Sequence, residues 1–347
     1  MDISLSYIDQ LFASFNKMRV LIVGDVMIDA YTEGSVERMS PEAPVPVFSV
    51  KKRYNRLGGA TNVAVNIKAL GAEPLVFSII GDDLKTEKFM QLMRRYGLEW
   101  RQLIKSGMRI TTVKERVICE GKQMIRIDEE QTNDLDEADQ AKLLMAIRKM
   151  IDTKNIGCII LQDYNKGVLT PTVIEEVIAM ARAKGIPVAV DPKKNNFLAY
   201  RGVNLFKPNA KELREGMAVE ADSIEAIQVA AVELQKRLQC QMLMTTLSEN
   251  GVVMLSKDGD EVRCQHIAAH PRDIKDVSGA GDTVLSVAAL CMAANAEPYT
   301  IAALSNLAGG LVCEKFGAVP IDKEQLISEA KKSYAQDAEA DTSDRDV

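Results

Sequence analysis

Short apolar runs of β-forming residues alternate with amphipathic helical patterns along most of the chain, and this alternation constrains the fold more than any other feature. Six runs are predicted as strands: RVLIVGD, PLVFSIIGDD, GCIILQDY, IPVAVDP, VNLFKPN and QMLMTTLS. The segments between them include TEKFMQLMRRYG and TPTVIEEVIAMARAKG, which have the periodicity of amphipathic helices. Such alternation forms βαβ units, so the sequence predicts an α/β protein with a mainly parallel sheet covered on both faces.

Polar residues stand at or just after the carboxyl end of each predicted strand. They are Asp25, Asp82, Asp163, Asp191, Asn209 and Thr246. The carboxyl ends of parallel strands lie at one edge of a sheet, and α/β proteins bind their ligands at that edge. We therefore expect the functional site there.

Two segments interrupt the alternation, at residues 34–56 and 109–130, and both have the pattern of extended strands without a helix between them. The second is predicted as a hairpin that turns at Glu120-Gly121. Together they predict a small β-strand lid over the ligand edge, which excludes water from a bound ligand. We expect residues 1–332 to form a single domain with this lid, and the acidic tail at 333–347 to be disordered.

Composition narrows the functional class. The chain has 347 residues, 47% of them hydrophobic, and a net charge of −6, which argues against a surface dedicated to nucleic acid or anionic lipid. Its six cysteines contain no C-x-x-C pair, as is typical of reduced, buried thiols. The sequence has no secretory leader pattern and no apolar run of membrane-spanning length. These features predict a cytoplasmic protein with a small-molecule ligand.

The stretch DVSGAGDT, residues 276–283, predicts an anion site. Gly279, Ala280 and Gly281 are small enough to let a ligand approach the backbone, and they precede an apolar helical pattern. The first turn of a helix offers unpaired N–H groups and the positive end of its dipole. Asp282 opposes a bound phosphate electrostatically, so its presence at this position indicates a chemical role.

A second glycine cluster, LGGATNVAVNIKALG, places Gly58 and Gly59 before a helix that carries Asn62. An amide both donates and accepts hydrogen bonds, which suits the hydroxyl groups of a polyol, although a glycine pair before a helix also serves as an ordinary entry turn. Neither the P-loop pattern nor G-x-G-x-x-G is present. The missing G-x-G-x-x-G leaves a nicotinamide oxidoreductase as the weakest alternative.

GGATN, KPNAKE and DVSGAGDT, in this order and spacing over residues 17–332, resemble the ribokinase-like (PfkB-type) sugar kinases. GDVMIDAY, SPEAPVPV, QMIRIDEE, DYNKG and DPK are similar to a branch of that family, the D-glycero-D-manno-heptose-7-phosphate kinases, which also form half of a bifunctional kinase/adenylyltransferase. The resemblance implies a ribokinase-like three-layer sandwich. It also implies ATP-dependent phosphorylation of the anomeric hydroxyl to the 1,7-bisphosphate, a precursor for lipopolysaccharide-core or surface-glycan synthesis.

The resemblance also assigns roles to residues. Asp282 is implied to be the general base, and Gly279, Ala280 and Gly281 the anion hole for the transferred phosphoryl group. The residues implied to bind the acceptor are Asp29, Gly58, Gly59 and Asn62. The phosphate group of the acceptor is expected to bind two or three of the cations Lys114, Arg116, Arg126, Lys166 and Lys193. The residues implied to bind ATP are Asn209, Glu212, Thr246, Ser248, Gly251 and Asn306. Asn209 and Glu212 are also implied to hold Mg²⁺ through water.

Other interpretations of these residues stay open. Asn209 and Glu212 also fit the first and fourth positions of a helix capping box, and each lysine or arginine is also consistent with a solvated surface charge. A kinase for another sugar or sugar phosphate, and a catalytically silent ligand-binding relative, are the alternative functions. The lid strands carry unpaired edges, which favours a homodimer formed through them.

Overall fold

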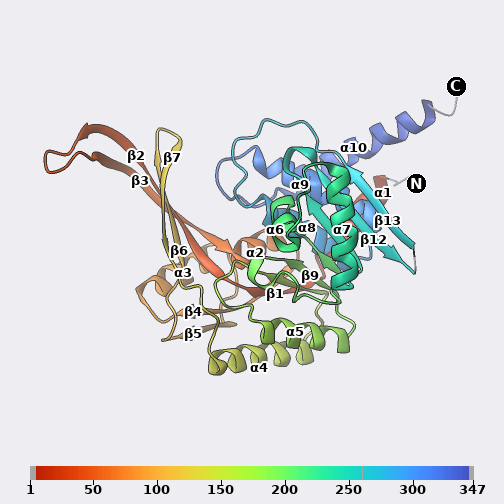
Figure 1. Cartoon of the computed structure of the whole chain (residues 1–347), viewed down its shortest axis with the longest axis horizontal. Coiled ribbons are helices and arrows are strands. Elements are labelled where there is room, and N and C mark those ends of the chain that lie inside the picture. Colours follow the sequence, from red (N-terminus) through yellow and green to blue (C-terminus); the bar gives the residue numbers. More distant parts are fainter. Residues whose placement is uncertain (1–4, 260, 344–347) are drawn as a thin grey trace.

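A nine-stranded sheet forms the centre of the molecule in the computed structural model, which describes residues 5–259 and 261–343 (Figure 1). The strand order is β13-β12-β11-β10-β9-β8-β1-β4-β5. The strands are β1 (Arg19–Gly24), β4 (Glu73–Gly81), β5 (Leu103–Ser106), β8 (Cys158–Gln162), β9 (Val188–Asp191), β10 (Leu205–Phe206), β11 (Met242–Thr246), β12 (Val252–Asp258) and β13 (Glu261–Ile267). Every pairing from β5 to β11 is parallel, and β12 and β13 add antiparallel pairs at one end. The predicted mainly parallel sheet and its six strands are confirmed.

Helices cover both faces of this sheet. One layer contains α1 (Leu5–Phe15), α2 (Ala60–Ala69), α3 (Leu84–Arg95), α8 (Ala280–Ala293), α9 (Pro298–Cys313) and α10 (Lys323–Ser343). The other contains α4 (Glu137–Thr153), α5 (Pro171–Ala183), α6 (Ala210–Met217) and α7 (Ile224–Leu238). Along β1, Val20 and Ile22 pack in the first core and Leu21 and Val23 in the second, so the strand is apolar on both faces. Burial of both faces explains why the sequence of β1 is a continuous hydrophobic run.

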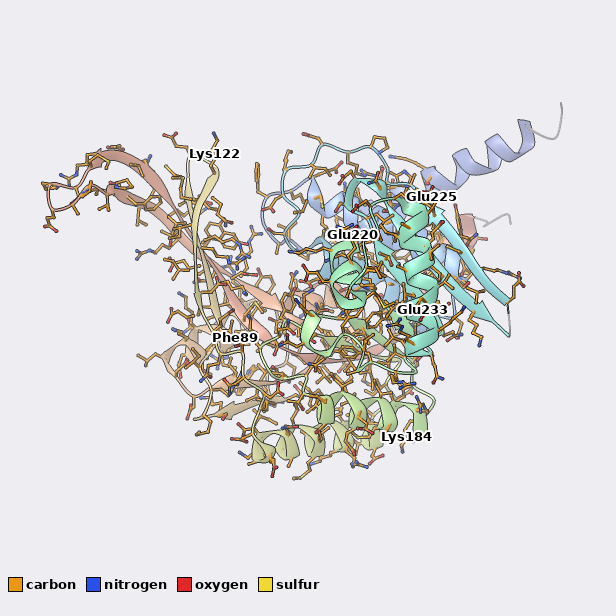
Figure 2. All side chains as sticks on the ribbon, in the orientation of Figure 1. Phe89, Lys122, Lys184, Glu220, Glu225 and Glu233 are labelled. Atoms are coloured by element: carbon orange, nitrogen blue, oxygen red, sulfur yellow. The ribbon has the colours of Figure 1, made fainter. Side chains whose placement is uncertain are left out.

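A separate four-stranded sheet, which we call the lid sheet, projects from the body in the order β3-β2-β6-β7 (Figure 1). Its strands are β2 (Val26–Met39), β3 (Pro46–Gly59), β6 (Val113–Cys119) and β7 (Lys122–Glu129). The predicted hairpin turn is present, because Glu120 and Gly121 both have positive φ, at 48° and 80°. Figure 2 shows Lys122 beyond this turn, far from the buried Phe89 of the body. The first pair of lid strands, β2 and β3, extends from Val26 to Gly59 and so exceeds the predicted segment 34–56 at both ends. The second pair, β6 and β7, lies within the predicted segment 109–130.

The C-terminal segment differs from its prediction. Helix α10 runs through Ser343, whereas the sequence predicts disorder from residue 333, and the predicted boundary at 332 therefore falls within a helix. The sequence KKSYAQDAEAD contains three alanines, two lysines, one glutamine and one glutamate, whose high helix propensity explains the continuation. Residues 344–347 of the predicted tail lie outside the described residues.

The cysteines also depart partly from their prediction. Cys158, Cys240, Cys291 and Cys313 are buried, but Cys264 is exposed and Cys119 is half-buried. Both exceptions belong to β-strands that are open to solvent, β13 at the sheet edge and β6 in the lid sheet. Within residues 5–259 and 261–343, the structure contains no helix long and apolar enough to cross a membrane.

Candidate active site

Helix α8 begins at the predicted anion site. Its N-cap, Gly279, has a φ of 79°, and a Cβ there would lie 2.8 Å from Nδ2 of Asn62. The left-handed backbone and this close approach both require glycine. A Cβ on Gly281 would meet Lys207 Nζ at 3.8 Å, so the turn faces a buried cation. Of the three predicted N–H donors, that of Ala280 already bonds the Val277 carbonyl oxygen at 3.2 Å in this conformation.

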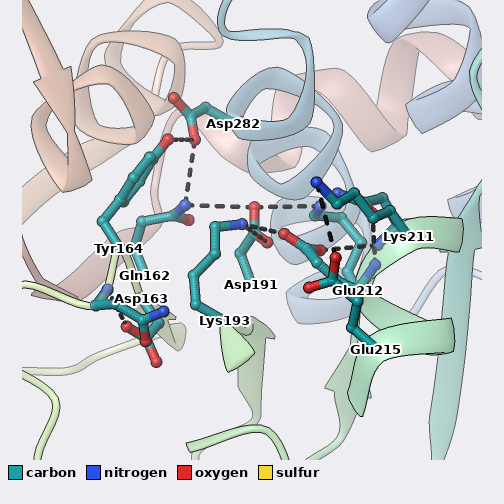
Figure 3. A network of polar contacts seen from close by, with 12 residues as sticks. Gln162, Asp163, Tyr164, Asp191, Lys193, Lys211, Glu212, Glu215 and Asp282 are labelled. Carbon is teal, nitrogen blue, oxygen red and sulfur yellow. Dashed lines mark hydrogen bonds and ion pairs between the residues drawn. The ribbon is translucent and has the colours of Figure 1, made fainter. Parts of the chain in front are cut away.

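Asp282 lies in the first turn of α8 with only 4% of its surface exposed, and donors from two other elements hold its carboxylate (Figure 3). Asn62 of α2 donates from Nδ2 to Oδ2 at 2.7 Å. The Tyr164 hydroxyl donates to Oδ1 at 2.8 Å, and Gln162 Nε2 reaches the same oxygen at 3.2 Å. Segments separated by more than 100 residues thus converge on one carboxylate.

The surroundings of Asp282 make it a weaker acid than usual. Burial, with a contribution from the nearby Asp191 carboxylate, raises the pKa of Asp282 from 3.8 to about 6. Hydrogen bonds from Asn62 and Tyr164 and the charge of Lys207 act in the opposite direction. Lys207 also pairs with Asp191 at 3.1 Å, so one buried cation serves both carboxylates. A carboxylate of this kind is mostly ionised at neutral pH yet basic enough to accept a proton.

Asp29 and the glycine pair lie at the junction between the body and the lid sheet. Arg116 of β6 donates from Nη1 to Asp29 Oδ1 at 2.6 Å. A Cβ on Gly58 would come within 2.5 Å of Asp29 Oδ2, so glycine leaves room for this carboxylate. Gly59, with a φ of 61°, is the N-cap of α2 and places Asn62 in the first turn of the helix. The predicted acceptor residues are therefore neighbours in space.

The other predicted phosphate-binding cations make ion pairs with acidic residues of the lid sheet and its following loop. Lys166 contacts Glu130 at 2.6 Å, and Lys114 contacts the same carboxylate at 3.1 Å. Arg126 donates to Asp128 at 2.9 Å, and its side chain is half exposed. In this conformation these cations are paired with Asp128 and Glu130, whereas Arg116 lies directly beside Asp29.

Lys193 lies between two carboxylates at the edge of the sheet (Figure 3). It contacts Glu212 closely and lies 3.7 Å from Asp191 Oδ1, and these two charges raise the pKa of Lys193 against the effect of burial. Asn209 and Glu212 form the capping box of α6, with hydrogen bonds of 2.8 and 2.9 Å. A carboxylate has about four acceptor positions, so Glu212 retains capacity for water. One amide oxygen and one carboxylate fit a hydrated Mg²⁺, which keeps several of its waters.

The predicted nucleotide residues gather at the far side of this edge. Thr246 ends β11 and pairs with Asn209 through an isolated bridge. Asn306 of α9 donates to the carbonyl oxygen of Ala268 at 2.8 Å, and a Cβ on Gly251 would meet the same residue. Ser248, with a φ of 54°, begins the short turn between Thr246 and Gly251. The structure therefore brings α9 and the β11–β12 turn together.

Sequence reasoning missed four residues of this arrangement. Tyr164, Gln162 and Lys207 surround the carboxylates, and Arg56 donates to the Ala318 carbonyl oxygen at 2.8 Å while it lies over the Tyr31 ring. Tyr164 stood in the DYNKG motif, and Gln162 and Lys207 stand one or two residues from predicted strand ends. Their proximity to a strand end was the available signal. No sequence signal indicated Arg56, because the register of β3 in the lid sheet is not visible in the sequence.

The family of the chain follows from comparison with known proteins. A family model described as pfkB family carbohydrate kinase matches residues 17–324. The chain belongs to this family. The predicted carbohydrate-kinase class and the family resemblance are thereby confirmed.

Curated relatives and solved structures agree with this family. "Bifunctional protein HldE" of Methylobacillus flagellatus is 38% identical over 319 residues, covering 91% of this chain and 64% of that protein. Its counterpart from Mesorhizobium japonicum is 38% identical over 331 residues, covering 95% and 65%. The chain thus spans slightly less than two thirds of these relatives.

The solved structures show the fold of this pfkB-family chain. Phosphofructokinase-2 of Escherichia coli in complex with potassium has a TM-score of 0.76 at 18% identity, covering 92% of this chain and 99% of that one. Arabidopsis thaliana ribokinase complexed with ribose and ATP has a TM-score of 0.69 at 16% identity, covering 89% and 98%. The predicted ribokinase-like α/β fold is confirmed.

Proposed function

We propose that this chain transfers the γ-phosphoryl group of ATP to the anomeric hydroxyl of D-glycero-D-manno-heptose 7-phosphate, giving the 1,7-bisphosphate. The observation that carries the proposal is the buried Asp282 carboxylate in the first turn of α8, three residues after the N-cap Gly279, which lies against Asn62. The resemblance of the sequence to heptose 7-phosphate kinases and the relatives named HldE support the acceptor. The structure of ribokinase with ribose and ATP supports the nucleotide.

In the proposed reaction, the acceptor hydroxyl gives its proton to the Asp282 carboxylate as its oxygen bonds the γ-phosphorus. The bond from that phosphorus to the β–γ bridging oxygen breaks, and ADP leaves. The N–H groups at the start of α8, chiefly those of Gly279 and Gly281, stabilise charge on the transferred group. Asn209 and Glu212 would hold a bound Mg²⁺ through water, and the ion would supply positive charge toward the phosphates of the nucleotide.

Buried oxygens without hydrogen-bond partners support a polyol acceptor. Within residues 5–259 and 261–343 they include Gln162 Oε1, Asp191 Oδ1 and the Tyr31 hydroxyl. The first two belong to side chains that flank Asp282, and Tyr31 is stacked under Arg116 beside Asp29. An unsatisfied buried acceptor costs about 1–3 kcal/mol, so hydroxyl donors that reach these atoms gain binding free energy. Arg116, Lys193 and the lid-sheet lysines supply positive charge for the 7-phosphate.

We further propose that the active form is a homodimer joined through the lid sheets. Strands β3 and β7 are the edges of this sheet, and on β7 the side chains of Ile125 and Ile127 are 56% and 46% exposed. Unpaired strand edges with exposed apolar side chains favour association with a second copy. Sedimentation velocity tests this proposal, and a single monomeric species at micromolar concentration contradicts it.

ATP consumption against a panel of acceptors tests the function. The panel contains both anomers of heptose 7-phosphate, sedoheptulose 7-phosphate, fructose 6-phosphate and ribose, and we expect turnover on heptose 7-phosphate alone. Turnover on another acceptor instead refutes the heptose assignment and leaves the chemistry intact. Asp282→Asn should bind ATP normally and lose at least about 10²-fold in turnover, the lower end of what a positioned base contributes. Near-normal turnover of this variant refutes the role of Asp282.

A further inference from the structure

The segment from Asp163 to Val168 is fixed to the body by a buried carboxylate that the proposed chemistry does not use. Asp25 is 2% exposed and accepts three backbone N–H groups of this segment. The donors are Tyr164 at 2.8 Å, Lys166 at 3.1 Å and Val168 at 3.1 Å. Three hydrogen bonds to one carboxylate hold the backbone from Tyr164 to Val168 in place.

Further contacts within the segment restrict it in the same way. Asp163 accepts the Asn165 N–H at 2.7 Å and the Tyr200 hydroxyl at 2.7 Å. Gly167 has a φ of 84°, and a Cβ there would lie 2.0 Å from the Asn133 carbonyl oxygen. The position of the Tyr164 side chain is therefore set before any ligand binds.

The Tyr164 side chain points from this segment to the proposed base (Figure 3). Its hydroxyl donates to Oδ1 of Asp282 at 2.8 Å, and Lys193 Nζ lies 5.6 Å from its ring centroid. Gln162 Nε2 donates to the same Oδ1. A carboxylate oxygen accepts about two hydrogen bonds, so Oδ1 is fully occupied, whereas Oδ2 accepts only from Asn62 among the described residues.

We propose that Tyr164 is a positioning residue that, with Gln162, occupies Oδ1 of Asp282, keeps the carboxylate ionised and leaves Oδ2 as the oxygen that takes the proton of the acceptor hydroxyl. This inference rests on the proposed role of Asp282 as the base. Tyr164 keeps its own proton throughout, because burial and the adjacent carboxylates raise the pKa of its hydroxyl well above 10. It therefore acts on the reaction only through Asp282.

The groups that face Asp282 allow a pH test of this role. They are Asn62 on α2, Gln162 and Tyr164 at the end of β8, Asp191 on β9, and Lys193 and Lys207 after β9 and β10. With the other charges unchanged, loss of the Tyr164 hydroxyl removes a hydrogen bond that favours the ionised carboxylate. The pKa of Asp282 then rises, and a larger fraction of the enzyme holds a protonated, inactive base at low pH.

The experiment compares pH profiles of kcat/KM for wild type, Tyr164→Phe and Tyr200→Phe, because kcat/KM reports ionisations of the free enzyme. Tyr200→Phe is the matched control, since it also removes a buried tyrosine-to-aspartate hydrogen bond of similar length, but at Asp163. It leaves in place the three Asp25 hydrogen bonds that hold the backbone of the Tyr164 segment. For Tyr164→Phe we expect the acid limb to move upward by about one pH unit, with activity recovered at high pH and KM unchanged. For Tyr200→Phe the acid limb should stay in place. Gln162→Met, which removes the second donor to Oδ1, should give a smaller shift in the same direction.

Each other result overturns the inference in a recognisable way. If Tyr164→Phe and Gln162→Met both keep the acid limb of the wild type while Asp282→Asn is inactive, the positioning role is refuted. The proposed role of Asp282 as the base then stands. A loss of activity at every pH, or a raised KM for the sugar phosphate, shows that the Tyr164 hydroxyl contacts substrate directly. Activity in Asp282→Asn refutes the base itself and with it this inference.

Discussion

Replacement of Asp282 by asparagine should stabilise the protein while it lowers turnover by at least about 10²-fold. Burial raises the pKa of Asp282 from 3.8 to about 6, so the folded state binds this proton more tightly than the unfolded chain does. The resulting contribution to stability is fully present below pH 3.8 and is lost as the pH rises through 6. The difference of about two pKa units corresponds to about 3 kcal/mol at neutral pH.

The expected gain from Asp282→Asn is smaller than this difference. The amide oxygen can accept from Tyr164 and Gln162, but the amide NH₂ group then faces Nδ2 of Asn62, and a lost hydrogen bond costs about 1–2 kcal/mol. We therefore expect a net increase of about 1–2 kcal/mol in the free energy of unfolding at pH 8, decreasing toward zero or below near pH 4.

Urea unfolding at pH 4, 6 and 8, followed by the fluorescence of Trp100, measures this difference. Asp82→Asn is the matched control, because Asp82 also follows a central strand but its side chain is 62% exposed. It should change stability by less than about 0.5 kcal/mol at every pH. A destabilised Asp282→Asn at pH 8, or a stability difference that is the same at pH 4 and pH 8, refutes the reasoning.

Two further predictions concern the glycine turn and the lid. Gly279→Ala and Gly121→Ala both place a side chain on a backbone of φ near 80°, which costs about 1–2 kcal/mol, but only the first also meets Asn62. Gly279→Ala should therefore lose at least about tenfold more kcat than Gly121→Ala, and equal kcat values for the two variants contradict this explanation. Arg116→Met should raise KM for the sugar phosphate about tenfold or more with KM for ATP unchanged, because Arg116 lies beside Asp29 on the acceptor side. An unchanged sugar KM excludes Arg116 from the acceptor site, and both predictions are tested by steady-state kinetics.

The body of the fold was predictable because its signals are local. Runs such as RVLIVGD are apolar on both faces, and a strand buried between two helix layers leaves that pattern in the sequence. The turn at Glu120-Gly121 was likewise visible, since a glycine between two extended patterns tolerates the positive φ that a tight turn requires. The end of α10 was not predictable from the sequence, because an acidic, polar segment of good helix formers is compatible with both helix and disorder.

The site was predictable only where a motif marked it. Asp282 and Gly279 stand in one such motif, but the partners of Asp282 come from positions 120 and 220 residues away along the chain. Gln162 reads as the last residue of a buried strand, and only the pairing of β8 with β1 and β9 shows that it reaches both carboxylates. Arg56 depends on the register of β3 against β2, which no local pattern sets.

The path of β3 has a consequence for how this enzyme family can diversify. The strand runs from the lid tip at Pro46 to Gly59 and continues directly into α2, which carries the partner of the proposed base. Exchange of the distal portion, whose side chains are mostly exposed, would change the proposed acceptor surface and leave the residues around Asp282 in place. Chimaeras joined within β2 and β3 are therefore the direct test of whether the distal lid sheet sets the acceptor in the proposed reaction.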